Sequence, residues 1–223
     1  DSVVADQDNV VSVGFADQEA SYLAGVAAAK STKTNHIGFI GGMEGVIIDR
    51  FEAGFVAGAK SVNPDIKITV DYAGSFADAA KGQTLAAAQY AAGADVIFHA
   101  SGGTGNGVFA AAKAENETRN EADKVWVIGV DRDQSAEGTY TSKDGKESNF
   151  VLASTLKEVG TSVKDIANKA LAGEFPGGEV LQFTLADGGV DLAETNLSED
   201  ASTAVADAKQ AILDGKVTVP ETP

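Results

Sequence analysis

The chain has 223 residues, of which 33 are acidic and 17 are basic, so its net charge is −16. This excess of negative charge repels the phosphate backbone of nucleic acids, which disfavours DNA and RNA as partners and favours an uncharged ligand. The absence of cysteine excludes a disulfide framework and a thiolate nucleophile, and the isolated His36 and His99 cannot build a zinc site by themselves. No apolar run approaches the roughly 18 residues that a membrane-spanning helix requires.

Short β-branched segments alternate with alanine-rich segments along the chain, a pattern typical of β-α units that build a parallel sheet covered by helices. The first part predicts strands at 9–15, 36–42, 67–73, 95–101 and 125–131, and helices at 16–30, 49–62, 78–93 and 108–117. The second part predicts a hairpin over 139–155 around the Asp144-Gly145 turn, a helix over 156–173, a loop and strand over 175–192, and a helix over 198–215. We therefore expect an α/β fold in which parallel sheets are flanked by helices.

Ligands of such sheets bind beyond the carboxyl ends of the strands, so the loops at that edge are the candidate site. Four loops qualify, at residues 41–50, 74–82, 101–107 and 131–138. The loop SGGTGNG lets the backbone approach a ligand closely. Its glycines are spaced G-x-G-x-G rather than G-x-G-x-x-G, which favours a tight turn lining a cleft over a phosphate site.

Asp131 directly follows an apolar strand, where a carboxylate can accept two hydrogen bonds from the vicinal hydroxyls of a ribose. A helix N-cap is an equally good interpretation of this aspartate. Asp131 and Asp133 also suggest an acid/base or metal pair, but one hydrogen-bonding carboxylate and one solvated or capping carboxylate fit better. The chain has no Walker-type motif and no G-x-S-x-G elbow, so catalysis has little support.

Phe98, near the end of its predicted strand, is a candidate to stack on a nucleobase. The alternative is a buried core phenylalanine, which we favour from the residues alone because strands in such sheets are buried on both faces.

Several segments together resemble the basic membrane protein family of substrate-binding lipoproteins: NVVSVGFADQEASYLAGVAAA, HIGFIGGMEG, RFEAGFVAGAKSVNPDIKI, DVIFHASGGTGNGVFAAA, VWVIGVDRDQ and GEFPGG. The resemblance implies a type I periplasmic-binding fold, in which two lobes joined by hinge strands close on a nucleoside without chemistry. It implies a purine nucleoside ligand (adenosine, guanosine or inosine), ABC permease subunits as partners, and no cofactor. It also implies an extracytoplasmic lipoprotein at the cell membrane of a Gram-positive bacterium, attached through a lipid anchor that is not part of this chain.

The resemblance assigns roles to five residues and no catalytic residue. Phe98 is similar to the aromatic that stacks on the purine, and Asp131 to the carboxylate that holds the ribose hydroxyls. Lys157 is similar to the lysine of the family's cleft, and Gly102 and Gly103 correspond to the glycine turn beside the base. A ligand-sensing regulatory domain of the same fold is the alternative, weakened by the lack of a helix-turn-helix and a basic patch.

Members of this family begin with a strand and two further β-α units before the segment with which this chain starts. We therefore expect residues 1–15 and 155–185 to be the remnant of a truncated first lobe, and 16–154 to form a complete second lobe. The lobe to which 186–223 belongs stays open. The first-lobe remnant is expected to expose apolar surface. Because half of the site would be missing, residues 1–223 alone are predicted to bind nucleosides weakly or not at all.

Overall fold

The computed structural model describes residues 3–4 and 7–223, and its centre is a six-stranded sheet with the strand order β10-β8-β5-β4-β2-β3. Neighbouring strands are parallel except for β10, which is antiparallel to β8. The strands are β2 (His36–Gly41), β3 (Lys67–Tyr72), β4 (Val96–Ala100), β5 (Trp126–Gly129), β8 (Val151–Lys157) and β10 (Val190–Glu194). The predicted α/β class is confirmed.

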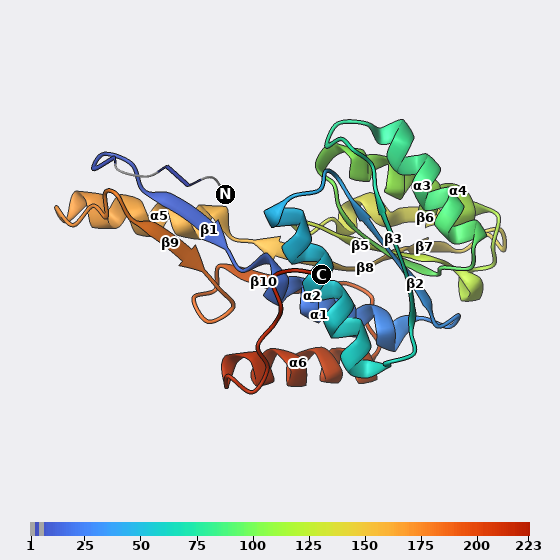
Figure 1. Ribbon diagram of the computed structural model, residues 1–223. Coiled ribbons are helices and arrows are strands. Elements are labelled where there is room, and N and C mark those ends of the chain that lie inside the picture. The colour runs from blue at the N-terminus through green and yellow to red at the C-terminus, as the bar shows by residue number, and fades with distance from the viewer. Residues whose placement is uncertain (1–2, 5–6) are drawn as a thin grey trace.

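Helices cover both faces of this sheet, as Figure 1 shows. Helices α1 (Asp17–Ser31) and α2 (Val46–Val62) pack on one face, and α3 (Ala79–Ala91) and α4 (Gly105–Glu117) on the other. Strand side chains alternate between the two cores, so that Phe98 lies in the first and Ile97 in the second. No helix of the described residues is long and apolar enough to cross a membrane.

A two-stranded parallel sheet lies beside the main body (Figure 1) and is formed by β1 (Ser12–Phe15) and β9 (Val180–Phe183). Helix α5 (Val159–Leu171) runs alongside it. We call these three elements the small layer, and they derive from the segments predicted for the first lobe. As predicted, this layer exposes apolar side chains, namely Val159, Val163, Leu171 and Val180.

The C-terminal segment packs on the six-stranded part of the molecule. Strand β10 forms its edge, and helix α6 (Glu199–Leu213) lies along α1. The predicted hairpin is also present, because β6 (Thr139–Thr141) pairs with β7 (Glu147–Asn149).

The prediction of a helix starting at residue 156 is wrong at its beginning. Strand β8 continues to Lys157 because its last residues pair with β10, where Val190 lies opposite Lys157. The helix therefore starts at Val159. The segment 175–192 likewise holds strand β9 and the beginning of β10, which continues to Glu194, where the sequence predicted one strand.

Candidate functional site

Three adjoining cavities follow the carboxyl edge of the six-stranded sheet. The central cavity has a volume of about 280 Å³ and is lined by Ile47, Ile48, Phe51, Phe76, Ala100, Ser101, Gly102, Val130, Asp131 and Lys157. The outer cavity, about 530 Å³, reaches Val13, Val180 and Gln182 of the small layer and shares Ile47, Ile48 and Phe76 with the central one. The polar cavity, about 290 Å³, is lined by His99, Gly102, Gly103, Asn106, Val130, Asp131, Arg132 and Gln134. The cavities therefore lie at the edge where the sequence predicts the candidate site.

Asp131 lies between the central and polar cavities and has a left-handed backbone, with a φ of +67°. Aspartate tolerates this conformation better than most residues, although at a cost. Its carbonyl oxygen accepts a hydrogen bond from the Lys157 N–H at 3.0 Å. On the other side, the Gln134 side chain accepts one from the Val130 N–H at 2.9 Å. Gln134, not Asp131, is the N-cap of the following 3-10 turn, so the capping alternative for Asp131 does not apply.

Lys157, at the end of β8, lines the central cavity beside a buried carboxylate. Its Nζ lies 3.1 Å from Oδ1 of Asp17, and the two side chains are 11% and 3% exposed. The ammonium also lies over the rings of Phe15 and Phe51, at 5.4 and 5.6 Å from their centroids. Burial raises the pKa of Asp17 to about 6, although the neighbouring Lys157 acts in the opposite direction. The sequence interpretation did not select Asp17, although it lies two residues after the segment predicted as the first strand.

Gly102 and Gly103 form a 3-10 turn against the loop that carries Phe76. A Cβ atom on either glycine would lie 3.3 or 3.2 Å from the Phe76 carbonyl oxygen, and Gly102 has a φ of +55°. The next residue, Thr104, donates from its N–H to that oxygen at 3.2 Å and from its hydroxyl to the Ser75 carbonyl at 2.9 Å. The turn thus holds the Phe76 loop in place.

The structure contradicts the predicted stacking role of Phe98. Its side chain is 0% exposed, and its ring packs at centroid distances of 5.3 Å from Phe55 and 5.7 Å from Phe39. The two-residue alternation of β4 points it into the core under α1 and α2. The core interpretation is therefore the correct one.

Phe76 is an exposed aromatic residue that lines the cavities. It is 44% exposed and lines both the central and the outer cavity. The sequence interpretation missed it, although a signal was present: Phe76 is the only aromatic residue in the four loops named as the candidate site.

His99 lies behind the polar cavity. Burial lowers its pKa to about 4, so the ring is neutral at physiological pH, and Nε2 lies 3.2 Å from the Gln134 side-chain oxygen. Among the residues that the structure describes, no group of three or more His, Cys, Asp or Glu side chains could hold a metal ion. The cavities offer an aromatic face on Phe76, the Asp131 carboxylate and the Lys157 ammonium, which suit the binding of a polar ring compound.

Comparisons with known proteins identify the family of this chain. The family model described as "ABC transporter substrate-binding protein PnrA-like" matches residues 1–222. The "ABC transporter nucleoside-binding protein BmpA" of Lactococcus lactis is 63% identical over 99% of this chain and 63% of its own length. The "CD4+ T-cell-stimulating antigen" of Listeria monocytogenes is 52% identical over 100% of this chain and 63% of its own length. The chain thus spans about 63% of the length of these relatives.

Solved structures share the fold. A solute-binding protein of an ABC transporter system from Aeropyrum pernix has a TM-score of 0.83 at 23% identity, covering 100% of this chain and 70% of that one. A transcriptional activator of the comK gene from Bacillus halodurans has a TM-score of 0.79 at 24% identity, covering 96% and 68%. The predicted periplasmic-binding fold is therefore confirmed. Proteins of the matched family bind substrates and are not enzymes, as predicted. The chain belongs to the PnrA-like family of ABC transporter substrate-binding proteins.

Proposed function

We propose that this chain captures a purine nucleoside in a cleft between the small layer and the six-stranded sheet and delivers it to an ABC importer. The observation that carries the proposal is the meeting of Phe76, Asp131 and Lys157 in one cavity. The relative from Lactococcus lactis is named as a nucleoside-binding protein, which supports the ligand class.

Each part of a nucleoside has a complementary group in this site. The exposed ring of Phe76 offers a stacking face for the base, and stacking of this kind is worth roughly 1 to 3 kcal/mol. The Asp131 carboxylate can accept hydrogen bonds from both ribose hydroxyls, while the Lys157 ammonium can donate to a ribose oxygen. The central and outer cavities, about 280 and 530 Å³, adjoin and together fall within the range of roughly 300 to 1,000 Å³ of small-molecule sites. A purine covers more of the Phe76 ring than a pyrimidine, so we propose purine nucleosides.

The two-lobe organisation is part of the same proposal. The small layer would belong to the first lobe, the six-stranded part to the second, and the crossings between them would act as the hinge on which the cleft closes. The partners would be ABC permease subunits. We also propose an extracytoplasmic location, on a lipid anchor at the membrane of a Gram-positive bacterium, the class to which the Lactococcus and Listeria relatives belong.

Titration calorimetry with adenosine, guanosine, inosine, uridine and ribose tests this function. Two forms are compared: residues 1–223, and the same residues fused to the part of the Lactococcus lactis relative that this chain does not cover. We expect the fused form to bind purine nucleosides in preference to uridine and ribose, and residues 1–223 to bind them weakly. Sub-micromolar binding to residues 1–223 would contradict the half-site prediction. Failure of both forms to bind any nucleoside would refute the function itself.

Variants of the fused form test whether the nucleoside binds in these cavities. Phe76→Ala and Asp131→Asn are expected to lower the affinity, whereas Phe175→Ala is the matched control. Phe175 is similarly exposed, 40% against 44% for Phe76, and lies outside the three cavities. Equal affinities of all three variants would mean that the nucleoside binds elsewhere.

A further inference from the structure

The ion pair between Asp17 and Lys157 joins two places where the chain passes between the small layer and the six-stranded part. Asp17 begins α1 two residues after β1 ends at Phe15. Lys157 ends β8 two residues before α5 begins at Val159. The 3.1 Å contact therefore bridges both crossings, and its lysine lines the central cavity.

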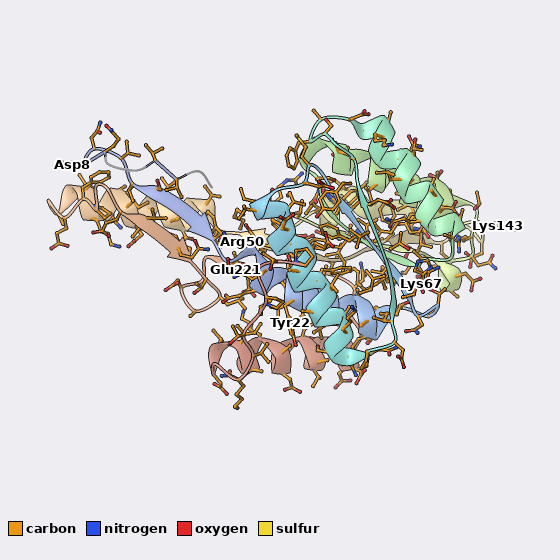
Figure 2. All side chains as sticks on the ribbon, in the orientation of Figure 1. Asp8, Tyr22, Arg50, Lys67, Lys143 and Glu221 are labelled. Atoms are coloured by element: carbon orange, nitrogen blue, oxygen red, sulfur yellow. The ribbon has the colours of Figure 1, made fainter. Side chains whose placement is uncertain are left out.

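Charged groups from three other parts of the fold face Asp17. Lys157 comes from β8, Arg50 from α2 and Asp131 from the loop after β5. Arg50 is itself paired with Glu221 of the C-terminal segment, at 2.9 Å, and the two lie together in Figure 2. Asp17 thus lies beside both chain crossings and close to Asp131 and Lys157, the two groups proposed to bind the ligand.

The fold gains little stability from keeping a charge at this position. Burial is the largest influence on Asp17 and disfavours its ionised form, even with Lys157 beside it. Buried ion pairs can often be replaced by apolar side chains without loss of stability, so such a pair is weak support for a purely structural role. Perturbed ionisable groups that line or adjoin a cleft are instead candidates for functional roles.

Building on the nucleoside site proposed above, we propose that Asp17 is a positioning residue that holds the Lys157 ammonium toward the ligand and makes nucleoside binding weaken in acid. When Asp17 is ionised, it fixes the ammonium at the central cavity and ties the two crossings together. When Asp17 takes up a proton, this attraction is lost and the Lys157 ammonium is held less firmly at the central cavity. Asp17 itself does not line any of the three cavities, so its effect passes through Lys157.

The test is the dissociation constant of inosine, which stays uncharged over the range used, between about pH 5 and pH 7.5 on the fused form. We expect the constant to rise roughly tenfold as the pH falls through the titration of Asp17, a change of about 1.4 kcal/mol. Asp17→Asn should bind as weakly at about pH 7.5 as the unaltered protein does at about pH 5, and its affinity should not change with pH. An Asp17→Asn protein with the unaltered affinity and pH profile would overturn the proposal.

A matched control separates this effect from the loss of any ion pair. Asp191→Asn removes the partner of Lys209, 2.6 Å away, in an ion pair between β10 and α6 that lines none of the three cavities. We expect this variant to keep the unaltered affinity and pH profile, and a loss equal to that of Asp17→Asn would overturn the proposal. If Asp17→Asn does not fold, the pH profile of the unaltered protein tests the proposal by itself. An affinity for inosine that does not change with pH would refute the role of Asp17. If inosine does not bind even at about pH 7.5, the nucleoside function fails, and this proposal fails with it.

Discussion

The backbone N–H of Lys157 donates a hydrogen bond of 3.0 Å to the carbonyl oxygen of Asp131. The bond joins the carboxyl ends of the neighbouring strands β5 and β8, and so fixes two residues that line the central cavity relative to each other. It also helps to hold Asp131 at its φ of +67°, a conformation that costs free energy in most residues. Strain of this kind at the edge of a cavity is a feature of pre-organised sites.

Substitutions at Asp131 are expected to separate backbone strain from ligand binding. Asn and Gly tolerate a positive φ, so Asp131→Asn and Asp131→Gly should change the free energy of unfolding little, whereas Asp131→Ala should cost about 1 kcal/mol more. All three should weaken nucleoside binding at least tenfold, because they remove charge-assisted hydrogen bonds worth about 1.5 to 3 kcal/mol. Urea unfolding and calorimetry measure the two effects. Equal stability of the Ala and Asn variants would show that the backbone relaxes.

Phe76 and Phe98 are expected to behave in opposite ways when each is replaced by alanine. Phe98 is fully buried, so Phe98→Ala should lower the free energy of unfolding by about 3 to 5 kcal/mol. Phe76 is 44% exposed, so Phe76→Ala should lower it by less than about 1 kcal/mol while raising the dissociation constant for inosine about 10- to 100-fold. A Phe98→Ala protein that is fully stable but does not bind inosine would show that Phe98, and not only Phe76, contacts the base.

Gly42 controls the position of the Phe76 ring. A Cβ atom on Gly42 would lie 2.2 Å from the ring, too close for any real contact, and the ring would have to move. We expect Gly42→Ala to weaken inosine binding in the unaltered protein and to have no further effect in a Phe76→Ala background. A double-mutant cycle measures this coupling. Additive losses in the cycle would mean that Gly42 acts on the ligand independently of Phe76.

The stability of the fold is expected to depend on pH through Asp17. Its pKa is about 6 in the folded protein and 3.8 in the unfolded reference, so the folded state holds the proton more tightly. The resulting stability is present below about pH 4 and is lost as the pH rises through about 6, a change of up to about 3 kcal/mol. Asp17→Asn removes this dependence, so the variant should gain stability relative to the unaltered protein as the pH rises from about 4 to 7.

Urea unfolding at a series of pH values measures this difference. His99 acts in the opposite direction, because its lowered pKa makes the fold lose stability as the pH falls from about 6.5 toward 4. Since His99 is present in both proteins, its contribution cancels in the difference. A difference in stability that is the same at every pH would show that Asp17 does not titrate in this range.

The sequence by itself determined the class of fold and the edge of the sheet at which the three cavities lie. The alternation of apolar strands and alanine-rich helices requires a covered parallel sheet, and the carboxyl ends of such strands meet at one edge. This is why the sequence places Asp131 and the Gly102-Gly103 turn at that edge, where they line two of the cavities. The same local pattern favoured a core position for Phe98, since a continuous apolar strand is buried on both faces.

Only the tertiary structure decided which aromatic ring faces the cavity and which carboxylate pairs with Lys157. Phe76 depends on its contacts with Thr104 and the glycine turn, which come from a different β-α unit. Lys157 ends a strand rather than starting a helix because β10, far along the chain, pairs with it. Its contact with Asp17 joins the two chain crossings. Local sequence patterns carry no information about such partners, since pairing between distant segments is set by packing of the whole chain.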